Sequence, residues 1–218
     1  MEKYLLASRS IVVGARACAA ALLLATAGCS PDPAQDTGEA SSRQCRYPVG
    51  ANGYDSGDVP PPTLSWGGWA EGGAASTIAL RDYFDCNGSK GVNAILVDQS
   101  AAWCGVCQTV ARKIGQNLRD GWSARGIHVI TLLSEGTDRS PATLDTALTW
   151  KQQFRLDGTA VAADPALSLR GTVAEAQALY PYEIVIDPRT MRIVEASAGY
   201  DGRGDFPSVV ALAERNAR

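Results

Sequence analysis

The sequence predicts a single α/β domain built around a central mixed sheet that is flanked by helices, with an N-terminal extension. Between residues 94 and 163, short apolar runs that suit buried strands alternate with segments of helical periodicity, as in strands joined by crossover helices. Two further strand-like runs lie on either side of a turn at 187–190, which predicts an antiparallel hairpin. The chain has 218 residues, 45% of them hydrophobic, which suffices for one domain of common size plus accessory segments.

The expected elements can be placed along the chain from apolar periodicity and from helix and strand breakers. Strands are expected at residues 63–66, 76–80 (a short strand or turn), 94–97, 127–133, 159–163, 182–187 and 191–196. Helical segments are expected at residues 81–84 (one turn), 107–118, 141–154, 172–179 and 206–215. The Gly67-Gly68 pair is expected to end the first strand, and Pro141 suits the first position of the helix that it opens. Gly115 lies inside the helix that follows Cys107 and is a candidate for a kink there.

The first 28 residues have the pattern of an export signal. Their front part contains three basic residues, Lys3, Arg9 and Arg16. The apolar run at 17–27 that follows is too short to span a bilayer. It ends in small residues directly before Cys29, an arrangement that resembles the bacterial lipobox, in which the cysteine becomes the lipidated first residue. The alternative is an ordinary secretory signal that is cut nearby, with Cys29 incidental.

Both interpretations place the mature chain outside the cytoplasm, in the cell envelope or periplasm. A lipid on Cys29 would anchor it to a membrane, and Ser30 next to that cysteine favours the outer membrane where one exists. Residues 29–62 are rich in Pro, Gly, Ser and Asp, which predicts a lipid tether followed by an extended arm. The predicted organisation is a signal at 1–28, the tether and arm at 29–62, and the folded domain at 63–218.

Charge and histidine content exclude several function classes. The formal net charge is -3 and no long basic run occurs, which argues against nucleic acid as a partner. The single histidine, His128, lies in an apolar strand, and we interpret it as structural. One histidine is too few for most histidine-based catalytic schemes and metal sites, so we expect no metal.

The cysteines predict two disulfides. Of six cysteines, Cys18 leaves with the signal and Cys29 is assigned to the lipid, which leaves Cys45, Cys86, Cys104 and Cys107. An even number in an exported chain indicates disulfides, and four cysteines allow three pairings. Cys104 and Cys107 have the C-x-x-C spacing of a redox dithiol, so Cys45–Cys86 is the natural structural pair; two free thiols are the alternative. A zinc site of all four is less favoured, because zinc knuckles usually come as two C-x-x-C pairs.

The segment from Asp98 to Cys107 carries the chemistry, since it follows an apolar strand and opens a helix. Cysteines three apart at a helix start can reach disulfide distance. The first of them, Cys104, would lie at the helix N-terminus, where the dipole and free N–H groups stabilise a thiolate. Cys104 is therefore the predicted nucleophile, and Cys107, further into the helix, the resolving thiol.

With Trp103 directly before Cys104, this segment resembles thioredoxin-like proteins, in particular the exported TlpA/ResA-like redoxins, over roughly residues 60–217. The resemblance implies a thioredoxin fold and a buried Asp98 that relays the proton of the second cysteine; an exposed strand-end aspartate is the alternative. It further implies a cis peptide bond at Pro181 facing the C-x-x-C, with Tyr180 and Trp103 in contact with the substrate; a trans proline that starts a strand is the alternative.

The resulting functional prediction is an extracytoplasmic thiol–disulfide oxidoreductase that reduces protein disulfides through Cys104 and Cys107, with no cofactor besides this redox-active pair. Its expected partners are protein thiols and disulfides and a membrane-bound electron donor. One alternative is a thiol peroxidase, although Ala101 occupies the position where peroxiredoxins carry a threonine. The other alternative is a non-catalytic binding module that retains the fold.

Overall fold

The computed structural model describes residues 45–50, 52–170, 179–199 and 204–218. All of them belong to one compact unit, Ser42–Arg218. The predicted signal at 1–28, the lipidation site Cys29 and the first part of the tether lie outside the described residues. Within the described ranges, no helix has both the length and the apolar character needed to cross a bilayer.

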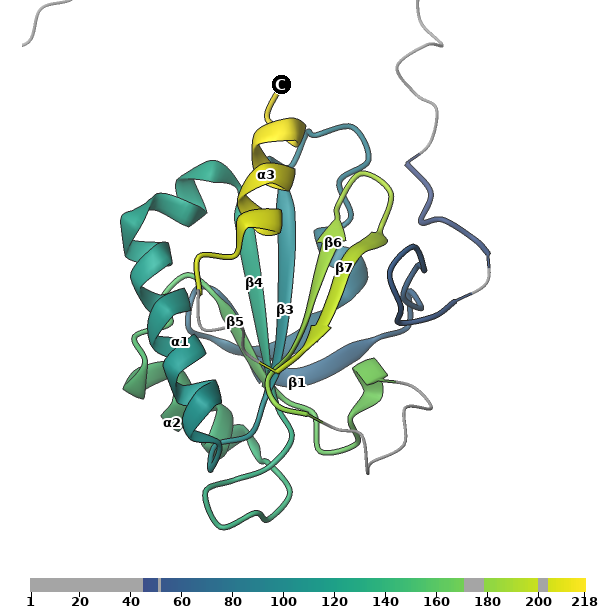
Figure 1. Cartoon of the computed structure of the whole chain (residues 1–218). Helices are drawn as coiled ribbons and strands as arrows, with labels where there is room; N and C mark the ends of the chain where they lie inside the picture. The colour runs from purple at the N-terminus through teal and green to yellow at the C-terminus, as the bar shows by residue number, and fades with distance from the viewer. Residues whose placement is uncertain (1–44, 51, 171–178, 200–203) are drawn as a thin grey trace, which may run out of the picture. The chain divides into compact units, whose positions relative to one another are not determined.

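The core of this unit is a seven-stranded mixed sheet (Figure 1). Its strands are β1 (Ser65–Trp69), β2 (Ala75–Ala79), β3 (Ala94–Ser100), β4 (Ile127–Leu133), β5 (Ala160–Ala163), β6 (Tyr182–Asp187) and β7 (Arg192–Ala198). Their spatial order is β2-β1-β5-β4-β3-β6-β7. The central strands β3, β4 and β5 run parallel, and the outer pairings are antiparallel. The predicted mixed sheet and its C-terminal hairpin are thereby confirmed.

Three α-helices of the described ranges pack against one face of the sheet. They are α1 (Gly105–Asn117), α2 (Leu144–Gln153) and α3 (Pro207–Asn216). Because β3, β4 and β5 are neighbours in sequence order, the right-handed crossovers between them place α1 and α2 on the same side. Apolar residues of all three helices join one buried cluster with the strands: Val110, Ala111 and Ile114 from α1, Ala147 and Trp150 from α2, and Val209, Leu212 and Ala213 from α3.

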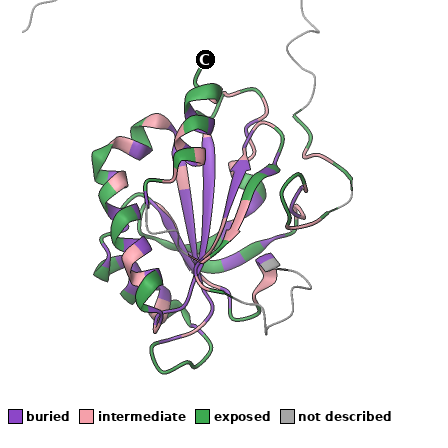
Figure 2. Ribbon diagram, viewed as in Figure 1, coloured by how far each residue is buried: buried purple, intermediate pink, exposed green. Residues whose placement is uncertain are grey.

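The opposite face is covered by the N-terminal arm and by short 3-10 turns, η1 (Leu80–Tyr83) and η4 (Ser168–Arg170). Val59 of the arm and Leu64, just before β1, enter a second buried cluster on this face, and Tyr47 packs against Phe84 with ring centroids 5.5 Å apart. Figure 2 shows the central strands as buried along their length, as expected for a sheet covered on both faces. The helix expected at 172–179 falls almost wholly outside the described residues.

The structure corrects the expected end of the first strand. Gly67 and Gly68 do not stop β1 but lie inside it, and Gly68 pairs with Ala162 of β5. A Cβ on Gly68 would lie 2.6 Å from the Cβ of Ala162, so the missing side chain permits this close pairing.

The structure also corrects the start of α2, which begins at Leu144 and not at Pro141. Thr143 caps the helix in a reciprocal arrangement with Thr146, and Pro141 instead forms an isolated bridge with Glu135. The capping hydroxyl therefore determines the helix start.

The helix α1 continues without a break through Gly115, where a kink was considered possible. A Cβ at Gly115 would lie 2.4 Å from the carbonyl oxygen of Phe154, so the glycine permits close packing beside the end of α2. The distortion comes later, in a π-helical turn, η2 (Leu118–Trp122), where Gly121 has a φ of 107°. Another short turn, η3 (Ser123–Arg125), completes the connection to β4.

The strand β3 is longer than the expected 94–97 because its pairing continues on both sides to its last residues. Ser100 still pairs with Leu133 of β4, and Gln99 with Tyr182 of β6. As a result Asp98 lies within a fully buried central strand and not at a solvent-exposed strand end. The turn to Cys104 follows directly from the end of this strand.

Candidate functional site

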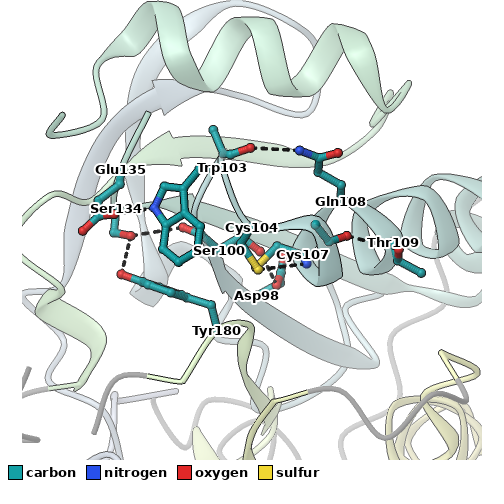
Figure 3. Close-up of a disulfide and its surroundings, with 12 residues drawn as sticks. Asp98, Ser100, Trp103, Cys104, Cys107, Gln108, Thr109, Ser134, Glu135 and Tyr180 are labelled. Atoms are coloured by element: carbon teal, nitrogen blue, oxygen red, sulfur yellow. Dashed lines mark hydrogen bonds between the residues drawn. A yellow bond between two sulfur atoms is a disulfide. The ribbon is translucent and has the colours of Figure 1, made fainter. Parts of the chain in front are cut away.

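The disulfide Cys104–Cys107 lies at the N-terminus of α1 (Figure 3). Cys104 is the N-cap residue of the helix, with extended backbone angles (φ -80°, ψ 110°), and the two Cα atoms are 5.2 Å apart. The Cys104 Sγ accepts a hydrogen bond from the backbone N–H of Cys107 at 3.1 Å. The sulfur thus occupies the place where a capping oxygen normally accepts one of the free helix N–H groups.

The two cysteines differ in access to solvent. Cys104 retains 7% of its surface, whereas Cys107 is fully buried against the strands. Of the two cysteines, only Cys104 therefore has any surface that a partner molecule could reach. This asymmetry fits the assignment of a nucleophilic and a resolving thiol.

Asp98 lies on the helix-covered face of β3, the face that carries α1. Along the strand, Leu96 belongs to the cluster under the helices and Val97 to the opposite cluster, so strand alternation turns Asp98 toward α1. In Figure 3 its carboxyl group points toward the disulfide. The residue is fully buried, which confirms a buried position and excludes the exposed strand-end alternative.

Burial raises the pKa of Asp98 to about 7, and the hydroxyls of Ser100 and Thr131 oppose this rise in part. The Ser100 hydroxyl donates to Asp98 Oδ1 at 2.9 Å. Within the described part of the chain, Asp98 Oδ2 has no hydrogen-bond partner. The carboxyl group therefore has one oxygen held by Ser100 and a second that is available to exchange a proton near neutral pH.

Trp103 and Tyr180 form two aromatic walls next to Cys104. The indole N–H of Trp103 donates to Glu135 Oε2. The rings of Trp103 and Tyr180 meet edge to face, with their centroids 6.1 Å apart. The Tyr180 and Ser134 hydroxyls lie 2.6 Å apart, and the Ser134 hydroxyl also donates to the carbonyl of Ser100. These bonds, drawn in Figure 3, hold both rings in place beside the disulfide.

The Tyr180–Pro181 peptide bond is cis, the isomer that the resemblance implied. It lies directly before β6, which pairs with β3 through Tyr182 and Gln99. The structure thus brings Asp98, Trp103, Cys104, Cys107 and Tyr180 together at the carboxyl end of β3.

Sequence reasoning missed three residues of this site, namely Ser100, Ser134 and Glu135. Ser100 lies two residues after Asp98 in the same strand and faces the same side, so strand alternation could have identified it. Ser134 and Glu135 follow β4, the strand parallel to β3. Their contacts with Tyr180 and Trp103 bridge 46 and 32 residues of sequence, and no local pattern signals such contacts.

The second disulfide, Cys45–Cys86, forms as predicted but does not belong to this site. The residue before Cys86 is tied to the β6–β7 turn, because the backbone N–H of Asp85 donates to Pro188 and Arg189 pairs with the Asp85 carboxylate at 3.1 Å. This turn lies at the start of β3, at the opposite end of the strand from Cys104. The bond attaches the N-terminal arm to the domain.

His128 also lies at the amino end of the sheet, near the start of β4, where its Nδ1 is 2.7 Å from Glu71 Oε1. Across the described ranges, no group of three or more His, Cys, Asp or Glu side chains is arranged to hold a metal ion. The pairing with Glu71 gives His128 a structural contact, in agreement with its interpretation from the sequence.

Comparison with solved structures shows what the fold resembles. A protein of Chlorobium tepidum assigned as the thiol:disulfide interchange protein DsbE superposes with a TM-score of 0.53 at 19% identity, over 73% of this chain and 97% of that one. A protein of Bacteroides thetaiotaomicron assigned as a protein disulfide isomerase gives 0.53 at 15% identity, over 77% and 92%. A 2-Cys peroxiredoxin of Plasmodium vivax gives 0.53 at 13% identity, over 74% and 80%.

These likenesses confirm the thioredoxin fold that the C-x-x-C segment implied. At the level of sequence alone, no protein-family model and no curated protein matches the chain. The fold is therefore recognised from its three-dimensional arrangement.

Asp98 gives the stability of the protein a testable pH dependence. The unfolded chain loses the Asp98 proton near the ordinary pKa of 3.8, whereas the folded protein keeps it up to about 7. Above pH 4 this raised pKa lowers the free energy of unfolding, and the loss grows until the pH passes about 7. We expect the Asp98→Asn variant to match the wild type at pH 4 and to exceed its free energy of unfolding at pH 8 by about 2–4 kcal/mol.

Urea unfolding of the oxidised protein at pH 4, 6 and 8 measures this difference. The exposed Asp120→Asn is the matched control and should show no comparable pH-dependent gain. A stability difference between Asp98→Asn and wild type that stays constant from pH 4 to 8 would contradict the raised pKa.

Proposed function

We propose that this chain is a thiol–disulfide oxidoreductase that works outside the cytoplasm and reduces protein disulfides through Cys104 and Cys107. The observation that carries the proposal is the placement of the pair: Cys104 caps a helix and reaches the surface, and Cys107 is buried behind it. The buried carboxyl group of Asp98, with its raised pKa, lies on the same side of the sheet. The names of two structural neighbours, an interchange protein and a disulfide isomerase, support the same class of reaction.

The reaction begins with the reduced protein. The Cys104 thiolate attacks one sulfur of the partner's disulfide, so an S–S bond forms between Cys104 and the partner while the partner's own S–S bond breaks. The partner's second sulfur leaves as a thiolate and takes up a proton. The helix N–H groups at the start of α1, which include the Cys107 N–H seen on Cys104 Sγ, stabilise the attacking thiolate.

The second step resolves the mixed disulfide. Cys107 loses its thiol proton to Asp98, and the resulting thiolate attacks Cys104 Sγ. The bond between Cys104 and the partner breaks, and the partner's sulfur leaves with both electrons and is protonated. The products are a partner with two thiols and the Cys104–Cys107 disulfide. An electron donor at the membrane then supplies two electrons and two protons to regenerate the dithiol.

The aromatic walls and the cis peptide bond provide the binding surface in this proposal. Trp103 and Tyr180 are both partly buried, and both are held by hydrogen bonds, so they present fixed ring surfaces beside Cys104. The backbone before Pro181 would pair with an extended segment of the partner, as in strand addition. The proposed substrates are therefore proteins with an accessible disulfide in an extended segment.

The location is proposed from the N-terminal sequence. Basic residues, an apolar run and small residues before Cys29 support an export signal at 1–28 and a lipid on Cys29, with an envelope location and a preference for the outer membrane where one exists. A lipid anchor would keep the domain close to a donor in or at a membrane. The tether between Cys29 and Cys45 would then set how far the domain reaches.

The exchange mechanism predicts different outcomes for the two cysteines. With insulin as substrate and dithiothreitol as reductant, we expect Cys104→Ser to react no faster than the uncatalysed mixture, because the only accessible sulfur is lost. We expect reduced Cys107→Ser, freed of dithiothreitol before it meets the substrate, to accumulate a mixed disulfide with it, visible by intact mass, because the resolving thiol is missing. The Cys45→Ala/Cys86→Ala double variant is the control and should retain turnover.

Equal activity of Cys104→Ser and the wild type would overturn the proposal. Consumption of hydrogen peroxide through Cys104, without reduction of insulin, would identify the peroxidase alternative instead.

The lipid is tested separately. In bacteria that express the full chain and are fed an alkyne-labelled fatty acid, we expect label on the wild-type protein and on Cys18→Ala, and none on Cys29→Ala. We also expect the Cys29→Ala protein to leave the membrane fraction. Labelling that persists in Cys29→Ala would place the lipid elsewhere, and an unlabelled wild type would favour an ordinary secretory signal.

A further inference from the structure

The loop between β4 and α2 packs against the redox site and has a braced conformation. The backbone N–H of Gly136 donates to the carbonyl of Ser140 at 2.8 Å, and that of Arg139 donates to the carbonyl of Gly136 at 3.2 Å. Asp138 Oδ1 accepts hydrogen bonds from the backbone N–H and the hydroxyl of Ser140, at 3.0 and 2.6 Å. Glu135 and Pro141 pair as an isolated bridge at the base. The loop is therefore fixed by its own hydrogen bonds.

The tip of this loop places a cation on Trp103. Arg139 has a left-handed backbone with φ 66°, which is uncommon for a residue with a side chain. Its guanidinium carbon lies 3.9 Å from the centroid of the Trp103 ring, well within the range of a cation–π contact. Trp103 is in turn held by Glu135 through its indole N–H. The charge of Arg139 thus lies on the ring of Trp103, the residue that directly precedes Cys104.

The Trp103 ring holds the Arg139 guanidinium in place, but the N–H groups of the guanidinium make no hydrogen bond within the described residues. Arg139 is exposed, and among the described residues its side chain has no hydrogen-bond or ion-pair partner. By contrast, the side chain of Arg189 donates to four acceptors on neighbouring segments. A planar guanidinium that is fixed on one face by a ring keeps its N–H edge free, and that edge matches a carboxylate in a bidentate geometry.

The nearby acidic side chains make their hydrogen bonds to groups other than Arg139. The Glu135 carboxylate accepts from Trp103, and the Asp138 carboxylate accepts twice from Ser140. Next to Cys104, the first turn of α1 contains no acidic residue, and Val106 is an exposed apolar side chain. A partner chain that approaches Cys104 along Trp103 therefore meets Arg139 as a cation with open donors.

We propose that Arg139 is a specificity-determining residue that binds a carboxylate of the partner protein, an Asp or Glu close to the disulfide that Cys104 attacks. This inference rests on the proposed function and adds its substrate class. No bond is made or broken by Arg139. It orients the partner next to Trp103 while the sulfurs exchange, and the contact would weaken at high ionic strength because it is exposed to solvent.

Synthetic peptides test this proposal with the full mature chain in its reduced form. Each peptide carries one cysteine in a mixed disulfide with a small neutral thiol, and the neighbouring residue is Glu, Gln or Lys. The second-order rate constant for release of the neutral thiol is measured at low and high salt. We expect the wild type to prefer the Glu peptide over the Lys peptide by about 2–30-fold at low salt, because attraction of the Glu side chain and repulsion of the Lys side chain add at this exposed site.

The variants separate docking from other roles. We expect Arg139→Gln to bring the Glu/Lys rate ratio close to one and Arg139→Glu to invert it. The matched control is Arg155→Gln, because Arg155 is another exposed arginine with a left-handed backbone (φ 53°), placed beside the far end of α1. It should keep the wild-type ratio.

Four results would overturn the inference. A wild type that reacts with all peptides at one rate, or an Arg139→Gln variant that keeps the Glu preference, would show that no carboxylate binds there. An equal fall of the rates for all peptides in Arg139→Gln would show that Arg139 acts on Cys104 and not on the partner. If the wild type reacts with none of the peptides, the result contradicts the proposed function itself, and this inference falls with it.

Discussion

The site depends on one hydrogen bond, from the backbone N–H of Cys107 to the sulfur of Cys104. It exists because α1 begins shortly after the buried strand β3, with Cys104 in the N-cap position where its sulfur accepts from a free N–H of the first helix turn. A sulfur in this position serves as the helix cap, and a negative charge on it would be favoured by the helix dipole. In the proposed function, this strand-to-helix junction is what makes Cys104 the reactive cysteine.

The same junction explains the role of Asp98. A carboxyl group in a central strand, without contact to water, keeps its proton until near neutral pH, as its pKa of about 7 shows. This burial is unfavourable for stability, which is a common feature of functional sites, and the sheet tolerates it because β4 and β6 hold the strand on both sides. Ser100 fixes one carboxyl oxygen, so the orientation of the other is determined.

Local patterns in the sequence predicted the order of the described strands and helices and the closeness of the C-x-x-C cysteines, and the family resemblance predicted the burial of Asp98. They failed where tertiary contacts decide: Gly68 continues a strand because Ala162 approaches closely, and Thr143 caps α2 where Pro141 was expected to open it. The bonds from Ser134 to Tyr180 and from Glu135 to Trp103 join distant segments, so only the folded chain reveals them. The stacking of Arg139 on Trp103 also depends on a loop conformation that the residues of the loop do not predict.

The central claim is that the sulfur of residue 104 is ionised at neutral pH because a helix starts beneath it. The most direct test is the rate of iodoacetamide alkylation of reduced Cys104 as a function of pH, followed by mass spectrometry of the peptide that contains it. The account predicts a midpoint below about 7.5, in the range of C-x-x-C thiolates at helix N-termini. A midpoint at or above about 8.5, the value of an ordinary cysteine, would contradict it.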